Sequence, residues 1–422
     1  MSYTSIDIKK GIKLHKIKTN KFKTNLIAVF LTTKLSREKV TKNALIPSVL
    51  KRGSTKFQTQ DLISKELEEM YGADFGCGID KTGDNQILKF FIETINQEFA
   101  IDNNMDLLKD AISNILDIIF NPYLENGVFK KEYVNQEKQN LKSIIDSKID
   151  NKSKYAVQRC IEEMYKDKPY GLFQFGYVED LENINEENLK YAYDELINNC
   201  KIDIFVSTDS EEEIFEIIKN NESIQLLKDR DAEYNEIDDL NKEKQEEKIV
   251  EESKEVAQGK LVLGLDVILD DNEKRYSTSV YNAILGGSAN SKMFQNVREK
   301  ENLAYVASSS YVRQKNNIII NIGIEIKNYK KALEVIRVQL DDMENGNFSD
   351  EDIENAKKSI ISGVRVIKEE QDTELTYYFG QEISKSKIEI DEYISKVEKV
   401  SKEDIVNIAN NININTVYFL KS

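Results

Sequence analysis

Apolar residues follow two different spacings along this chain, and each spacing predicts one kind of element. Segments with apolar residues at alternate positions, bounded by Gly, Asn, Asp or Ser, predict strands. We expect strands at 14–17, 26–33, 73–80, 86–94, 202–206, 260–267, 303–311, 317–325 and 417–420. Segments with apolar residues three and four positions apart predict helices. We expect helices at 39–51, 58–70, 104–120, 127–149, 153–166, 271–285, 291–300, 328–344 and 349–369.

Two pairs of these strands are close enough in sequence to form hairpins. The first hairpin would turn around residues 19–23, and the second around 82–85, where Gly83 and Asp84 favour a tight turn. In both halves of the chain, such strands precede runs of helices. This order predicts an α+β fold with two homologous halves, each a largely antiparallel sheet with helices packed against it.

Two motifs recur at nearly equal offsets, which indicates an internal duplication. A helix with a good N-cap residue begins near Asn185 and leads to a strand, and another begins near Ser401, an offset of 401 − 185 = 216. A long helix starts near Phe129 and another near Phe348, an offset of 348 − 129 = 219. Duplication explains two similar offsets better than chance, although capped helices before strands also occur in unrelated proteins.

The composition of the chain changes between the two halves. Residues 229–252 consist largely of Asp, Glu, Lys, Asn and Gln, with almost no apolar periodicity. Such a segment predicts a solvated, charged linker. We therefore expect an N-terminal domain at 1–228, this linker at 229–252, and a C-terminal domain at 253–422.

The charge of the chain excludes several classes of partner. A net charge of −16 and a pI near 4.9 disfavour nucleic acid and anionic membrane surfaces. No apolar segment follows Met1, and none approaches the roughly 18 apolar residues of a membrane helix, so we expect a cytoplasmic protein. Cys77, Cys160 and Cys200 are odd in number and far apart, which favours buried thiols in a reducing compartment.

The segment from 281 to 309 is the most distinctive part of the sequence. Gly286 and Gly287 end one helix, Ser291 suits the cap of a second, and the residues after it lead into a strand. With its Leu-Gly-Gly-Ser, Val-Arg-Glu-Lys and Leu-Ala-Tyr runs, this segment resembles the C-terminal half of the pitrilysin/insulinase-type zinc metallopeptidases. The resemblance implies a metallopeptidase clam-like architecture of two peptidase-like domains.

The resemblance also locates the positions where this family carries an inverted zinc motif, His-x-x-Glu-His. In the family this motif lies on the first helix after the first hairpin and is followed by Gly-Thr, which Gly53-Ser54 matches here. The match places Ala44 and Ser48 at the two histidines, and Pro47 at the glutamate that acts as general base. Alanine has no donor atom, serine is a poor zinc ligand, and proline accepts no proton.

The third zinc ligand of the family is a glutamate seven residues after another acid. The resemblance places Glu137 at the earlier acid and Ile144 at the ligand. The one histidine of the chain, His15, lies in a strand-like segment, where packing or solvent exposure is commoner than metal binding. We therefore expect no metal, no cofactor and no catalytic residue. Pro47 removes one backbone N–H, so we also expect a kink or a late start in its helix.

Two residues of the signature retain useful chemistry. In the family, an arginine of the Val-Arg-Glu-Lys run and a tyrosine of the Leu-Ala-Tyr run face the peptide substrate, and these match Arg298 and Tyr305. A guanidinium can hold a peptide carbonyl, and a phenol can donate to a carbonyl or an oxyanion. Without the resemblance, they would be an ordinary surface arginine and a half-buried strand tyrosine.

The resemblance implies a non-catalytic bacterial subunit, an inactive peptidase homologue. Such a subunit would complete a peptide-binding chamber with a zinc-bearing paralogous subunit, as a heterodimer or in a self-dimer, and would handle peptides or unfolded protein. The label of the most similar family group links it to elongation factor P modification. The alternative is a stand-alone peptide-binding or scaffolding protein. A catalytic homodimer would need zinc ligands, and the single histidine argues against it.

Overall fold

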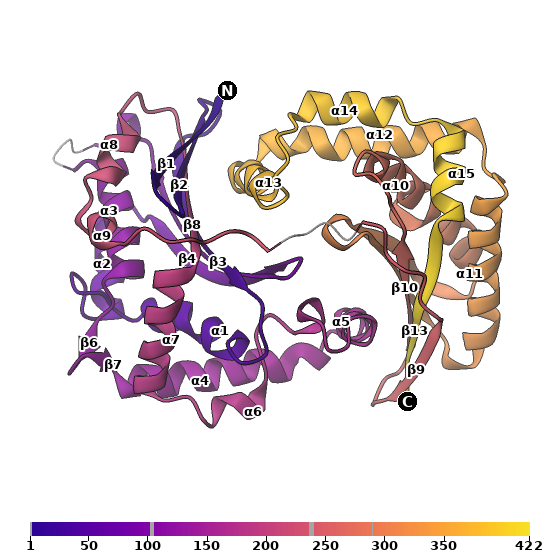
Figure 1. Ribbon diagram of the computed structural model, residues 1–422, viewed down its shortest axis with the longest axis horizontal. Helices are drawn as coiled ribbons and strands as arrows, with labels where there is room; N and C mark the ends of the chain where they lie inside the picture. The colour runs from indigo at the N-terminus through magenta and orange to yellow at the C-terminus, as the bar shows by residue number, and fades with distance from the viewer. Residues whose placement is uncertain (1, 102–104, 236–239, 289) are drawn as a thin grey trace. The chain divides into compact units, whose positions relative to one another are not determined.

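The computed structural model contains two main sheets, each in its own unit (Figure 1). It describes residues 2–101, 105–235, 240–288 and 290–422. The first unit comprises Met1–Asp146, Leu172–Glu236 and Gln371–Tyr378, and the second comprises Ser147–Gly171, Ile237–Glu370 and Phe379–Ser422. The predicted α+β class is confirmed. Each unit takes segments from both halves of the sequence, and the predicted domain limits stay a prediction.

Six strands form the sheet of the first unit, in the order β1-β2-β8-β3-β5-β4. Their bounds are β1 (Ser2–Lys9), β2 (Ile12–Lys18), β3 (Thr24–Lys34), β4 (Asp74–Thr82), β5 (Asn85–Ile95) and β8 (Lys201–Thr208). The hairpin predicted around residues 19–23 is wrong, because β8 lies between β2 and β3. Seven of the eight residues of β8 are buried, which is typical of a central strand whose two faces are both covered. The hairpin around 82–85 is confirmed, with Gly83 at a φ of 54° in its turn.

Helices cover one face of this sheet and form one apolar core with it. Their bounds are α1 (Val40–Leu50), α2 (Gln60–Glu69), α3 (Leu107–Phe120), α4 (Lys131–Asp146), α6 (Val178–Leu181), α7 (Glu186–Asn199), α8 (Ile214–Lys219) and α9 (Glu222–Leu226). A small two-stranded sheet, β6 (Leu124–Glu125) and β7 (Val128–Phe129), precedes α4. α1 runs without interruption across Pro47, so the late start considered for this helix is wrong.

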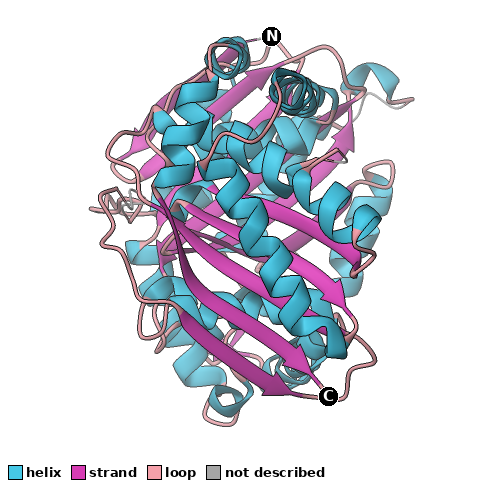
Figure 2. Cartoon of the chain, turned by 90° about the vertical axis from the view of Figure 1, so that its right-hand side faces the viewer, coloured by secondary structure: helices cyan, strands magenta, loops and turns pink. Residues whose placement is uncertain are grey.

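Five strands form the sheet of the second unit, in the order β11-β12-β10-β13-β9. They are β9 (Lys248–Ser253), β10 (Gly259–Val267), β11 (Ala304–Val312), β12 (Asn317–Ile324) and β13 (Ile412–Lys421), the strand that ends at the label C in Figure 2. One face packs against α10 (Lys274–Asn282), α11 (Tyr329–Glu344), α12 (Asp350–Val366), α14 (Ile390–Glu398) and α15 (Lys402–Asn410). The other face packs against α5 (Lys152–Met164).

The topology of the two sheets supports the predicted duplication. The order β2-β8-β3-β5-β4 corresponds to β9-β13-β10-β12-β11, and in each sheet the pair at the same end is parallel. The predicted cap residues Asn185 and Ser401 both form capping boxes at the equivalent helices α7 and α15.

The helices α5 and α13 (Gln371–Ile383) begin at an offset of 371 − 152 = 219, so they are equivalent in the repeat. α5 comes from the first half of the sequence but packs on β10 and β13 of the second unit. The first residues of α13 come from the second half but belong to the first unit, where Gln371 donates to the Ser207 hydroxyl at 2.9 Å. This exchange of equivalent helices explains why both units combine both halves.

The predicted linker at 229–252 is not solvated throughout. Arg230 and Tyr234 are buried in the first unit, where Tyr234 donates to the Asp203 carboxylate at 2.6 Å. At its other end the predicted linker enters β9, in which every second residue faces α5. Residues 236–239 of the predicted linker lie outside the described residues.

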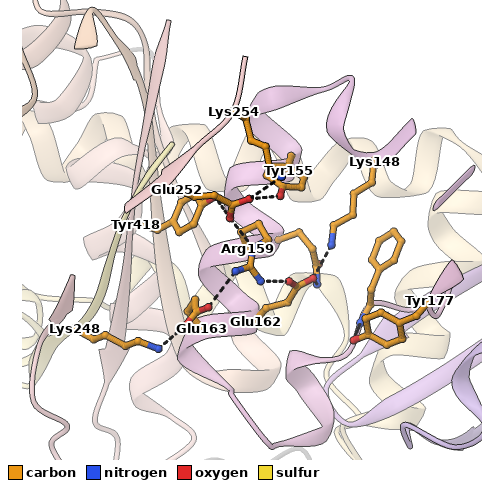
Figure 3. A network of polar contacts seen from close by, with 12 residues as sticks. Lys148, Tyr155, Arg159, Glu162, Glu163, Tyr177, Lys248, Glu252, Lys254 and Tyr418 are labelled. Atoms are coloured by element: carbon orange, nitrogen blue, oxygen red, sulfur yellow. Dashed lines mark hydrogen bonds and ion pairs between the residues drawn. The ribbon is translucent and has the colours of Figure 1, made fainter. Parts of the chain in front are cut away.

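A network of polar contacts attaches α5 to β9 and β13 (Figure 3). The Glu252 carboxylate accepts hydrogen bonds from Tyr155 at 2.6 Å, Tyr418 at 2.9 Å and Arg159 at 3.0 Å. Arg159 also donates to Glu162 at 2.5 Å and to Glu163 at 3.1 Å. Burial alone would raise the pKa of Glu252, but these hydrogen bonds bring it below its usual value.

Candidate functional site at the degenerate zinc motif and the Arg–Tyr pair

The helix that matches the zinc motif is a core helix. Nine of the eleven residues of α1 are buried, and the helix packs against β5, α4 and α7. Ala44 is 4% exposed and Pro47 is buried, whereas Ser48 is partly exposed. With apolar residues on nearly every side, this helix contributes its surface to packing rather than to a ligand.

Glu137, the acid retained on α4, is paired with Arg52, which lies just beyond the end of α1. Its Oε1 accepts from Nε of Arg52 at 2.5 Å and also pairs with Nη2, and its Oε2 accepts from Asn140 at 3.0 Å. Arg52 donates a further hydrogen bond to Gln60 at 3.1 Å. Because the Arg52 guanidinium pairs with its carboxylate, Glu137 could bind a metal ion only if a largely buried ion pair were broken.

The remaining groups near this helix are also unsuited to zinc. Burial raises the pKa of the Cys77 thiol to about 11, with Lys51 lowering it and Glu137 raising it further, so the thiol stays protonated at neutral pH. Ile144 lies two turns beyond Glu137 on α4, is 45% exposed, and offers no donor atom. Among the described residues, no group of three His, Cys, Asp or Glu side chains lies close enough to hold a metal.

His15 is fully buried in the first unit rather than exposed at a site. Its Nε2 lies 3.0 Å from the Asp203 carboxylate, and its Nδ1 lies 2.8 Å from the Tyr3 hydroxyl. Its ring stacks on Phe205 with 4.1 Å between centroids. With both ring nitrogens hydrogen-bonded inside the protein, this histidine has no nitrogen left for a metal.

In the second unit, the signature segment forms two widened helical turns before β11. The turns η4 (Ala283–Gly287) and η5 (Met293–Lys300) have π-helical spacing, as in the bond from Glu301 N to Asn296 O at 3.1 Å. Glycine is needed at position 286, because a Cβ there would lie 2.7 Å from the backbone N of Ser309. Ser309 in turn donates to Asn282 at 2.7 Å, which fixes β11 against the end of α10.

The cap predicted at Ser291 is wrong. Its backbone carbonyl accepts from Gln295 N at 2.9 Å, but its buried hydroxyl has no hydrogen-bond partner among the described residues. The widened spacing of η5 changes the positions of the first amides relative to those of an ordinary helix, which a sequence pattern does not reveal. Ala289, also part of the signature, lies outside the described residues.

Arg298 and Tyr305 lie at the two ends of the turn between η5 and β11. The guanidinium of Arg298 lies over the ring of Phe294 at 4.6 Å, and its Nε lies 3.4 Å from Glu299. The Arg298 side chain is 43% exposed, and Tyr305 is 58% exposed at an irregularity in the pairing of the edge strand β11. The arrangement supplies a planar cation and a phenol donor to solvent.

The predicted site residues thus divide between the two units. Ala44, Pro47, Ser48 and Ile144 belong to the first unit, and the Arg–Tyr pair belongs to the second. The sequence analysis did not identify Arg52, which pairs with Glu137, or Phe294, whose ring lies beneath the Arg298 guanidinium.

A spacing of four could have revealed Phe294, which precedes Arg298 by four positions in the same helical segment. No such signal exists for Arg52, which lies beyond the end of α1 and pairs with an acid 85 residues away.

No helix within the described part of the chain is both long and apolar enough to cross a membrane.

Comparisons with known proteins identify the family of the chain. Residues 183–360 match the family model described as "Peptidase M16 inactive domain". The chain is 31% identical to the "Probable inactive metalloprotease YmfF" of Bacillus subtilis, over 97% of this chain and 96% of that protein. It is 24% identical to an "Uncharacterized zinc protease" of Rickettsia felis, over 76% of this chain and 75% of that protein.

A similar solved structure is that of a conserved protein from Enterococcus faecalis V583. Its TM-score is 0.92 and its sequence is 27% identical, with 100% of this chain and 99% of that chain covered. The similarity therefore extends over the whole chain rather than over one unit.

Proposed function

Because the chain is an inactive member of the peptidase M16 family of pitrilysin/insulinase-type metallopeptidases, we propose that it completes a peptide-binding chamber with a zinc-bearing paralogous subunit. One observation carries this proposal. The positions that would hold zinc carry Ala44, Ser48 and Ile144, none of them a good ligand, while Arg298 and Tyr305 stay exposed. The exposed guanidinium and phenol are therefore accessible to a peptide.

In this proposal the two residues hold the peptide backbone. The guanidinium of Arg298, oriented by Phe294, donates to a peptide carbonyl through its planar N–H groups. The Tyr305 phenol donates to the carbonyl that is attacked, or to the oxyanion that forms from it. The partner supplies the metal and the general base, so the working site is shared between two chains.

The partner, the compartment and the process are parts of the same proposal. Zinc proteases among the relatives make a metal-bearing paralogue a natural partner, and a self-dimer is the other assembly considered. We place the complex in the cytoplasm and its substrate among peptides or unfolded proteins. The family label that links such subunits to elongation factor P modification suggests examining that protein's modification state after deletion of this chain's gene.

The experiment is peptide hydrolysis by the mixed complex. The zinc-bearing paralogue is combined with wild-type chain, with Arg298→Ala or with Tyr305→Phe, and assembly is checked by size-exclusion chromatography. Loss of one transition-state donor costs about 2.7–4 kcal/mol, so kcat/KM should fall roughly a hundredfold or more while assembly is unchanged.

Matched controls are available on the same chain. Arg365→Ala removes an exposed arginine from the last turn of α12, and Tyr191→Phe alters a tyrosine that is 72% exposed on α7. Both controls should cleave as well as wild type. If the Arg298 and Tyr305 variants also assemble and cleave normally, the pair is a remnant and the chain serves as a scaffold.

A further inference from the structure

A cavity of about 630 Å³, widely open to solvent, lies in the second unit, beside the first turn of α5. Residues 150–153 form one wall, and residues 255–258 together with Lys260 of β10 form another. Sites for small ligands commonly have volumes of about 300–1,000 Å³. This cavity includes neither the residues of the degenerate zinc motif nor the Arg–Tyr pair.

Lys260 brings an ammonium group to this cavity without a matching acid. Its one hydrogen bond among the described residues is a long one, 3.4 Å, to Oε1 of Gln258, and no carboxylate within the described ranges lies at ion-pair distance. Burial lowers the pKa of the Lys260 ammonium, and no neighbouring charge offsets that cost. A partly buried cation of this kind is stabilised when an anion binds beside it.

A glycine on the neighbouring strand leaves room for this ammonium. Lys260 on β10 pairs with Gly323 on β12, and a Cβ at position 323 would lie 3.3 Å from Nζ of the lysine. Alanine at this position would therefore push the ammonium aside without changing any charge. The position of the cation depends on the absence of a side chain at residue 323.

Two carboxylates line the same cavity at a distance from the lysine. Asp150 and Glu255 are exposed residues of the two walls, and neither affects the pKa of Lys260 nor pairs with it. Opposite charges thus face one cavity without neutralising each other. Lys152 also lines the cavity, so two ammonium groups and two carboxylates face it, and this balance of charge suits a ligand with one charge of each sign.

We propose that this cavity binds a short peptide with two free termini. The peptide carboxylate would lie against Lys260, and its terminal ammonium would lie toward Asp150 and Glu255. The proposal does not depend on a protease partner, because all the residues concerned belong to the second unit of this chain.

The test is isothermal titration calorimetry of the full chain with trialanine. We expect binding at millimolar concentration or tighter, and about tenfold weaker binding for trialanine whose carboxylate is amidated or whose amino group is acetylated, as loss of one charged contact of about 1.4 kcal/mol implies. Equal binding of the blocked peptides, or no binding of free trialanine at about 10 mM, would overturn the proposal.

Variants separate the charge of Lys260 from its position. Lys260→Met should weaken binding of free trialanine about tenfold, and Gly323→Ala should weaken it although the charge is kept. Lys330→Met is the matched control, since Lys330 is exposed on α11 and does not line the cavity. Thermal unfolding of each variant confirms that it is folded. Normal binding by folded Lys260→Met would exclude this lysine from the site.

A separate measurement tests the role of the two carboxylates, Asp150 and Glu255. The double variant Asp150→Asn, Glu255→Gln should bind free and acetylated trialanine equally, because nothing then distinguishes a charged amino terminus. A preference for the free amino terminus that persists in the double variant would contradict the proposed orientation.

Discussion

The helix α1 and the segment from α10 to η5 occupy equivalent places in two sheets of the same topology, yet they differ in what they expose. α1 lies between β3 and β4, and the other segment lies between β10 and β11. The first is almost wholly buried and carries no zinc ligand, whereas the second exposes Arg298 at its end. The comparison shows that equivalent positions in a repeated fold can differ in burial, and therefore in the chemistry that they offer to a ligand.

Breaking the ion pair between Arg52 and Glu137 should cause the largest loss of folding stability. Arg52→Met leaves a buried carboxylate uncompensated, and breaking a buried pair in this way costs about 3–5 kcal/mol. Chemical denaturation should show this loss, and the double variant Arg52→Met, Glu137→Met should recover most of it. Arg365→Met, at an exposed position, is the control. An unchanged stability in Arg52→Met would mean that the carboxylate finds another partner.

Local pattern predicted much of the fold, and distant contacts account for what it missed. The spacing of apolar residues located most helices and strands, and the signature segment indicated the family. The placement of β8 between β2 and β3, and the exchange of α5 and α13, depend on pairings between segments far apart in sequence. The same holds for the site. Arg52 and Glu137 are 85 residues apart, so no local motif could reveal that one neutralises the other.

Restoring the three residues of the zinc motif should not by itself give tight zinc binding. In the triple variant Ala44→His, Pro47→Glu, Ser48→His, two ligands return, but Glu137 remains paired and position 144 still lacks a carboxylate. Adding Ile144→Glu should tighten zinc binding by about a hundredfold or more, because a ligand contributes at least as much as the group that orients one. Metal analysis after dialysis against competing chelators gives the comparison. Equally tight zinc in the triple variant would show that another group on the chain completes the site.

The attachment of α5 should depend on pH through Glu252. Because its hydrogen bonds hold the pKa of this carboxyl below the unfolded value, its stabilisation is present above the unfolded pKa, about 4.3, and is lost as the pH falls below it. Glu252→Gln should cost about 1 kcal/mol at pH 7, reduced from the value for a buried charged hydrogen bond by partial exposure, and should cost less at pH 3. Urea unfolding at both pH values measures this, with the exposed Glu403→Gln as control. A loss equal at both pH values would assign the effect to packing.

The smallest expected effect concerns the ring beneath Arg298, and it distinguishes an oriented cation from a merely exposed one. A cation over an aromatic face at a partly exposed site gains about 0.5–1 kcal/mol, and Phe294 provides that face at 4.6 Å. Phe294→Leu should therefore lower kcat/KM of the mixed complex by about two- to fivefold, whereas Arg298→Ala lowers it roughly a hundredfold. Phe294→Tyr keeps the ring and should behave as wild type. Because the contact positions the arginine without touching the peptide, adding Phe294→Leu to Arg298→Ala should cause no further loss. A further loss in the double variant would instead assign Phe294 a direct contact with the substrate.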